Sequence, residues 1–112
     1  MILGLDISTS ITGYTVLDWD GSILACDHID LRKEKDFFKK IEIVDSVLQS
    51  IKNNYEIETV YIEQSLQSFR SGFSSAQTLS LLSKINGIVS WLCYNIFSGT
   101  PNYIGASSAR KA

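Results

Sequence analysis

The stretch that decides the fold is residues 2–17, which read ILGLDISTSITGYTVL. Two apolar runs, residues 2–7 and residues 12–17, are separated by a short polar turn, and this pattern predicts two consecutive strands. The dipeptide Asp20-Gly21 comes soon after the second run, and Asp-Gly is the strongest short signal for a β-hairpin. We therefore expect a third strand over residues 22–29 and an antiparallel three-stranded meander at the start of the chain.

Helical and strand patterns alternate through the rest of the sequence. Apolar residues recur at helical spacing from about residue 36 to residue 53, which predicts an amphipathic helix. A fourth strand is predicted at residues 59–63, parallel to the first because a helix precedes it. The remaining expected elements are a loop at 64–73, a long helix from Ser74 or Ser75 to about residue 97, a fifth strand at 103–104 and a helix beginning at Ser107 or Ser108.

Length and composition indicate one folded domain spanning residues 1–112. With 45% hydrophobic and 20% charged residues, the chain can bury a real core, and disorder is excluded. The fold class that we expect is α/β, with a mixed five-stranded sheet and helices on its faces. No run of about 18 uncharged apolar residues occurs, so we expect no membrane span.

The two cysteines, Cys26 and Cys93, lie far apart in apolar stretches. We interpret them as reduced core residues of a cytoplasmic protein; a disulfide between them is the alternative. A single histidine argues against a zinc site.

Charge is distributed unevenly along the chain. All twelve acids lie at or before Glu63, so residues 1–63 carry −6 and residues 64–112 carry +4. Such asymmetry is typical of a side that faces a polyanion; chance, together with a buried helix that excludes charge, is the alternative. The four cations of the second half are Arg70, Lys84, Arg110 and Lys111.

Two carboxylates end apolar strands. Asp6 closes the first predicted strand and Glu63 closes the fourth, and the carboxyl ends of adjacent parallel strands meet at one edge of a sheet. Paired carboxylates without a nearby His or Cys suit a hard cation such as Mg²⁺ or Mn²⁺. The alternative is that each acid caps a neighbouring loop or helix.

These motifs resemble those of the RuvC-type Holliday-junction resolvases. Residues 2–16 resemble the family's Ile-Leu-Gly-Ile-Asp strand, polar turn and Thr-Gly-Tyr-Gly-Val strand, and residues 61–64 resemble its Ile-Glu-Gln segment. Residues 84–87 fall where the family has Gln-Ala-Arg-Gly on a helix, and residues 103–111 resemble its last strand and the Arg-Gln-Val-Lys-type helix start. The resemblance implies an RNase H-like fold.

The resemblance also implies metal-dependent hydrolysis of phosphodiester bonds in branched DNA such as four-way junctions. Asp6 and Glu63 would be the catalytic carboxylates, with Asp6 bridging two Mg²⁺ ions and Glu63 holding one, and Mn²⁺ could replace Mg²⁺. The expected DNA contacts are aromatic wedging or stacking by two loop residues and phosphate binding by four cations. These candidates are Phe69, Phe73, Arg70, Lys84, Arg110 and Lys111; loop packing and ordinary solvated charge are the alternatives.

The sequence departs from the family pattern in three places. Asp6-Ile7-Ser8 replaces the family's Asp-Pro-Gly, the interval from Glu63 to Gly87 is longer, and no acid follows Glu63, whereas the family has two further acids on a C-terminal helix. We therefore expect a chain truncated at its C-terminus, or a degenerate member, and a 112-residue form that cuts weakly or not at all.

Resolvases of this type act as dimers, and the nearly uncharged helix 74–97 is the expected homodimer face. Trp91 and Tyr94 are the candidate contacts, although a tryptophan in a small domain is often a core residue. The basic cluster at residues 32–40 is interleaved with acids, and we interpret it as a solvated helix start.

Two other functions stay open at this stage. Residues 4–21 also resemble the phosphate-binding hairpin of sugar kinases and actin-like ATPases, although Ile7-Ser8 fits poorly where those proteins need glycines. The second alternative is a non-catalytic relic of the nuclease fold that binds branched DNA or a protein.

Overall fold

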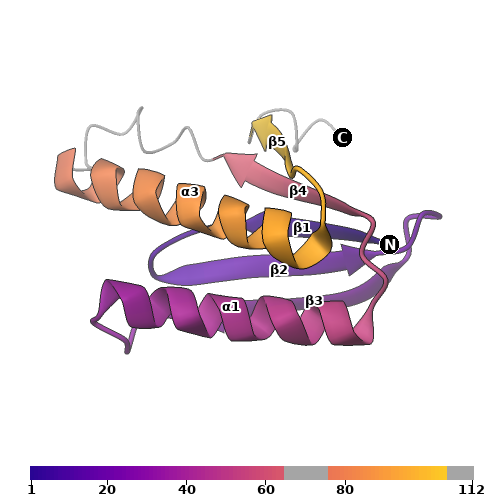
Figure 1. Cartoon of the computed structure of the whole chain (residues 1–112), viewed down its shortest axis with the longest axis horizontal. Coiled ribbons are helices and arrows are strands. Elements are labelled where there is room, and N and C mark those ends of the chain that lie inside the picture. The colour runs from indigo at the N-terminus through magenta and orange to yellow at the C-terminus, as the bar shows by residue number, and fades with distance from the viewer. Residues whose placement is uncertain (65–75, 106–112) are drawn as a thin grey trace.

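Five strands and two helices make up the part of the chain that the computed structural model describes, residues 1–64 and 76–105 (Figure 1). All five strands and both long helices predicted from the sequence are present, with ends shifted by one or two residues. The loop after Gln64, the helix caps Ser74 and Ser75, and the expected helix start at residue 107 or 108 lie outside the described residues. In chain order the elements are β1 (Ile2–Asp6), β2 (Ile11–Leu17), β3 (Ile23–Asp30), α1 (Phe37–Asn54), β4 (Thr59–Gln64), α3 (Ala76–Phe97) and β5 (Asn102–Gly105).

The strands form one mixed sheet in the order β3-β2-β1-β4-β5. The first three strands pair antiparallel, and β4 pairs in parallel with both β1 and β5. The mixed five-stranded sheet expected from the sequence is therefore confirmed. Its central strands are β1 and β4, whose carboxyl ends reach the same edge.

The predicted hairpin joins β2 to β3. The Asp18 N–H donates to the Ser22 carbonyl at 2.9 Å, and the Gly21 N–H donates to the Asp18 carbonyl at 3.0 Å. Gly21 has a φ of 91°, a left-handed conformation that glycine adopts without steric penalty. The Asp-Gly pair therefore closes this turn as its chemistry predicts.

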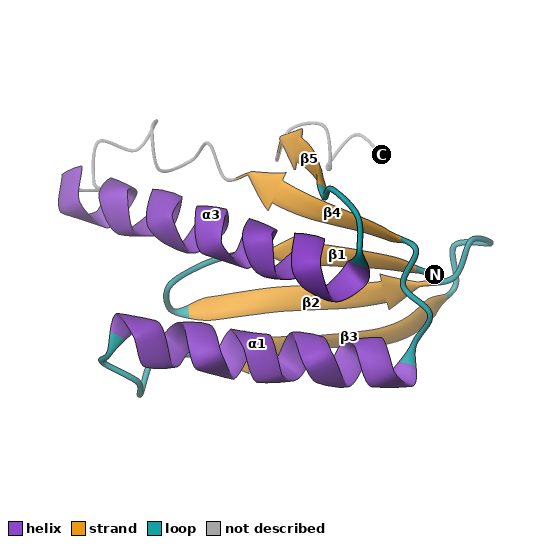
Figure 2. Ribbon diagram, viewed as in Figure 1, coloured by secondary structure: helices purple, strands orange, loops and turns teal. Residues whose placement is uncertain are grey.

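Both described helices cover the same face of the sheet (Figure 2). Alternate residues of the strands point to that face and are buried against the helices, whereas the residues between them point to the other face, which no described helix covers. The buried strand residues include Leu3, Leu5, Val16, Val60 and Ile62. The hydrophobic core is therefore one-sided, and each strand has one face available for a site.

Local sequence explains why α1 begins where it does. The Asp36 carboxylate accepts hydrogen bonds from the N–H groups of Phe38 and Lys39, so it caps the first turn. The apolar stripe of the helix then buries Val44, Leu48 and Ile51, and complete burial of such a side chain stabilises the fold by about 1.5–3 kcal/mol. In α3, the corresponding buried residues are Ile85, Val89, Leu92, Cys93 and Ile96.

The two cysteines are both free, but only one of them is in the core. Cys93 is buried in α3, and burial raises the pKa of its thiol to about 12. The prediction that Cys26 is also a core residue is wrong, because its position in β3 points to the uncovered face and leaves it exposed. Neither described helix combines the length and hydropathy that crossing a membrane requires.

Candidate functional site

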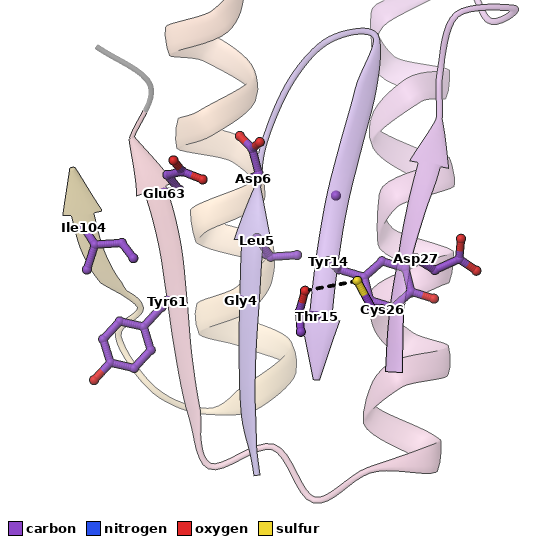
Figure 3. Close-up of a pocket in the computed structure, with 11 residues that line it drawn as sticks. Gly4, Leu5, Asp6, Tyr14, Thr15, Cys26, Asp27, Tyr61, Glu63 and Ile104 are labelled. Carbon is purple, nitrogen blue, oxygen red and sulfur yellow. Dashed lines mark hydrogen bonds between the residues drawn. The ribbon is translucent and has the colours of Figure 1, made fainter. Parts of the chain in front are cut away.

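The register of β1 against β4 brings the two predicted carboxylates together. Asp6 is the direct partner of Glu63 in the parallel ladder, and neighbouring strands lie about 4.8 Å apart. Both side chains stand on the uncovered face, near the tips of their strands, as Figure 3 shows. The strand register therefore brings the two acids together, as the sequence predicted.

A cleft of about 290 Å³ opens below the two carboxylates on the same face. Its floor includes Gly4 and Gly13, which carry no side chains to fill it. Gly13 is the β2 partner of Asp6, and a Cβ atom added to it would lie 4.0 Å from the Asp6 Cβ. The cleft therefore depends on two glycines that flank the first carboxylate.

Asp6 is perturbed by its surroundings. Burial of part of its carboxyl raises the pKa of Asp6 above its ordinary value, because low-dielectric surroundings disfavour the charged form. A bound cation would offset this penalty by favouring the carboxylate. A raised pKa is therefore what is expected of an acid that lacks a positive partner.

The loop that follows Asp6 is held by its own hydrogen bonds. The buried Thr12 hydroxyl donates to the Ser8 carbonyl at 3.0 Å and accepts from the Ser8 N–H at 3.2 Å. The Ser10 N–H donates to the Ser8 hydroxyl oxygen at 3.1 Å. These bonds define the path of the chain immediately after the first carboxylate.

A lysine from α1 also contacts this loop. The Lys40 ammonium donates to the Thr9 carbonyl at 2.6 Å, and the Leu31 N–H donates to the Ser10 carbonyl at 2.7 Å. The interpretation of the whole 32–40 cluster as solvated charge is therefore wrong for Lys40, which is half-buried. The helix start and the loop after Asp6 are joined.

The other predicted site residues are not brought to the carboxylates within the described chain. Lys84 is exposed on α3. The candidates Phe69, Arg70, Phe73, Arg110 and Lys111 lie outside the described residues. Within residues 1–64 and 76–105, no group of three or more His, Cys, Asp or Glu side chains gathers as a metal site, so Asp6 and Glu63 are a pair.

Among the residues that line the cleft, Thr15, Cys26 and Tyr61 were not predicted from the sequence as site residues. The Thr15 hydroxyl donates to the Cys26 sulfur at 3.6 Å (Figure 3). A signal for Tyr61 was present, since a residue two positions before Glu63 in a strand shares its face. No comparable signal marked Cys26, because its place depends on the pairing of β2 with β3.

Comparison with solved structures identifies the fold. The chain superposes on RuvC of Thermus thermophilus in complex with a Holliday junction substrate with a TM-score of 0.78 at 11% identity, covering 98% of this chain and 67% of that one. Another Thermus thermophilus RuvC structure matches with a TM-score of 0.72 at 10% identity, covering 99% of this chain and 67% of that one. This is the RuvC-like RNase H fold.

A viral protein shares that fold. The Fowlpox virus resolvase, solved in complex with Holliday junction DNA, matches with a TM-score of 0.52 at 20% identity over 94% of this chain and 60% of that chain. No protein-family model matches the sequence, and no characterised protein is a significant relative by sequence. The likeness is therefore one of fold.

The Thr12 hydroxyl gives a first prediction. In a Thr12→Val variant the Ser8 N–H and carbonyl lose their partner, and leaving such groups unpaired costs about 1–3 kcal/mol. Urea unfolding followed by circular dichroism should show a loss of that size. Thr15→Val, which removes the bond to the Cys26 sulfur at 3.6 Å, should change stability by less than about 0.5 kcal/mol. Equal losses in both variants would contradict the role given to Thr12.

Asp6 gives a second prediction, on stability against pH. Because the folded-state pKa of Asp6 is raised, the folded state binds the proton more tightly than the unfolded state does. Stability from this group is present at low pH and is lost as pH rises through the folded-state pKa. Asp6→Asn should therefore be more stable than the parent at pH 7 in metal-free buffer, and the difference should shrink on acidification. A less stable variant at pH 7 would contradict this reasoning.

Proposed function

We propose that this chain is the nuclease domain of a Mg²⁺-dependent endodeoxyribonuclease that acts on branched DNA such as four-way junctions. The observation that carries the proposal is the pairing of Asp6 with Glu63 at the ends of adjacent parallel strands, above a cleft on the uncovered face. The fold supports it, because RuvC and the Fowlpox virus resolvase were both solved with Holliday junction DNA.

The donor set fits a magnesium ion. Mg²⁺ binds through one or two carboxylates together with substrate phosphates and retains several waters, and two carboxylates on one open face leave space for those ligands. When bound, the metal would polarise the scissile phosphate and lower the pKa of a water nucleophile. Because no further carboxylate joins Asp6 and Glu63 among the described residues, we expect the 112-residue chain to cut slowly.

The residues of the chain have separable tasks in this scheme. Asp6 and Glu63 supply the oxygen ligands, and Thr12 with Lys40 fixes the loop next to Asp6 through the bonds to Ser8 and Thr9. The glycine floor lets a sugar–phosphate backbone approach the sheet closely. The cations Arg70, Lys84, Arg110 and Lys111 would add phosphate contacts, and Phe69 and Phe73 would stack on or wedge between bases.

The loop chemistry argues against the nucleotide-binding alternative. A phosphate-binding hairpin needs free backbone N–H groups after the strand. Here the Ser8 N–H is bonded to the Thr12 hydroxyl and the Ser10 N–H to the Ser8 hydroxyl. Two of the donors that would cradle a phosphate are therefore already used within the loop.

The test of the proposal is cleavage of a four-way junction in Mg²⁺ by the parent and by Asp6→Asn and Glu63→Gln. Each substitution should lower the rate by at least about 100-fold, since a metal ion supplies several kcal/mol of transition-state stabilisation and about 1.4 kcal/mol is tenfold. Glu56→Gln is the matched control, because Glu56 is exposed and precedes β4 at its opposite end.

Unchanged cleavage in Glu63→Gln would contradict the assignment of the site. Junction binding without cleavage in the parent, unaffected by Mg²⁺ or Mn²⁺, would instead favour the non-catalytic alternative. Both results are read from the same gel, so the two functions are distinguished directly.

We also propose that the protein is a homodimer through α3. Trp91 and Tyr94 are 62% and 54% exposed, and Lys84 is the single charged residue between Ala76 and Phe97. An exposed helix with so little charge is typical of an interface. A second copy suits the two-fold symmetry of a four-way junction.

The dimer proposal predicts a shift in molar mass. By analytical ultracentrifugation the parent should sediment as a dimer and Trp91→Glu as a monomer, because a carboxylate would be buried unpaired in the interface. Ile23→Glu is the control, since Ile23 is 66% exposed on β3, away from α3. A monomeric parent at all concentrations would contradict the proposal.

A further inference from the structure

An exposed aromatic ring stands at the start of α1. Phe38 is 72% exposed, the highest value among the exposed large hydrophobic residues of the described chain. The half-buried Phe37 packs against the core, and its ring meets the Phe38 ring edge to face, with centroids 5.7 Å apart and an interplanar angle of 82°. The exposed ring is therefore supported by a neighbour while most of its surface faces solvent.

Three exposed cations lie within five residues of this ring in the sequence. Of the five cations between residues 32 and 40, Arg32 is bonded to the Asp30 carboxylate at 2.9 and 2.7 Å, and Lys40 is bonded to Thr9. The other three form no ion pair within the described residues and are exposed. They are Lys33, Lys35 and Lys39.

Acids are interleaved with these lysines and reduce the positive charge of the segment. The Asp36 carboxylate is committed to the helix cap, where it accepts from the Phe38 and Lys39 N–H groups at 2.9 and 3.1 Å. Glu34 is half-buried and Glu42 is exposed. Between residues 30 and 42, with the Arg32–Asp30 pair included, five cations stand against four acids, so the segment keeps one net positive charge.

The segment from Leu31 to Lys40 is hydrogen-bonded to the loop that follows Asp6 in the candidate site. The bonds from Lys40 to Thr9 and from Leu31 to Ser10 join it to the loop that follows Asp6. The start of α1 and the carboxyl ends of β1 and β4 therefore lie at the same end of the sheet (Figure 2). The first turn of α1 is therefore joined to the loop after Asp6, although α1 covers the face of the sheet opposite the two carboxylates (Figure 2).

We propose that the first turn of α1 is a second DNA-contact surface, on which Phe38 stacks against an unpaired base while Lys35 and Lys39 contact phosphates of the same strand. Proteins that bind single-stranded nucleic acids stack the bases on aromatic side chains and bind the phosphates with nearby cations. A paired base would first have to be unstacked to meet such a ring, so the occupant is an unpaired strand at a branch point. This inference rests on the proposed function and extends it.

The test measures binding to a four-way junction with unpaired bases at its centre, in Ca²⁺ to prevent cleavage. Phe38→Leu keeps an apolar side chain but removes the aromatic ring, and it should weaken binding by about 5- to 150-fold. Binding to a fully paired duplex should change much less. Circular dichroism confirms that the variant folds, as expected for a side chain that is 72% exposed.

The lysines are tested by salt dependence. The double variant Lys35→Ala/Lys39→Ala should reduce the slope of log K against log salt by about 1.4, the value for two phosphate contacts on a single strand. Lys52→Ala is the matched control, because Lys52 is exposed in the last turn of the same helix, and its slope should equal that of the parent.

The outcomes separate this inference from the proposed function. If the parent binds the junction and Phe38→Leu binds equally well, the α1 surface is wrong and the nuclease proposal stands. If Asp6→Asn loses cleavage while Phe38→Leu loses affinity, both are supported. If the parent shows no preference for the junction over duplex DNA, the inference and the proposed function are both overturned.

Discussion

The parallel pairing of β1 with β4 is the constraint on which the site depends. It places Asp6 opposite Glu63, and the one-sided core maintains the register. Leu3 and Leu5 in β1, with Val60 and Ile62 in β4, are buried against the helices. A slip of β4 by one residue would turn Val60 and Ile62 to water and Glu63 into the core, and the same slip in β1 would do this to Leu3, Leu5 and Asp6. Hydrophobic burial on one face therefore positions the chemistry on the other.

The uncovered face carries features near Asp6 that contribute little to the stability of the fold. Two glycines leave a hollow beside Asp6, although glycine weakens a strand by its backbone entropy and lack of packing. The Asp6 carboxyl is held where burial raises its pKa. Local features that oppose the fold are expected at functional sites, and here they gather around one residue. In the function that we propose, a cation and a phosphate backbone would satisfy them.

Much of the fold was predictable because its signals are local. Alternation of apolar residues, the Asp20-Gly21 turn and the spacing of Val44, Leu48 and Ile51 each depend on neighbours in the sequence. The convergence of Asp6 with Glu63 was also predictable, since a strand that follows a helix pairs in parallel with the first. Strand ends shifted by one or two residues, as is usual when fraying competes with pairing.

Long-range packing determines which face or partner three side chains meet, and local sequence patterns do not predict it. Cys26 belongs to an apolar stretch, yet its register with Thr15 turns it to the uncovered face. Lys40 belongs to a charged run, yet the docking of α1 carries its ammonium to the Thr9 carbonyl. Phe38 and Phe37 are adjacent aromatics of equal hydropathy, and only the helix orientation shows which of them is exposed. None of these three outcomes depends on neighbours alone.

A crystal structure of the protein grown with Mn²⁺, with anomalous scattering used to locate the metal, would show whether Asp6 and Glu63 bind one ion together. If the two acids form a metal site, a manganese peak should lie within bonding distance of carboxylate oxygens of both Asp6 and Glu63. A crystal saturated with Mn²⁺ in which the metal lies elsewhere, or binds one of these acids while the other turns away, would contradict the proposed metal site.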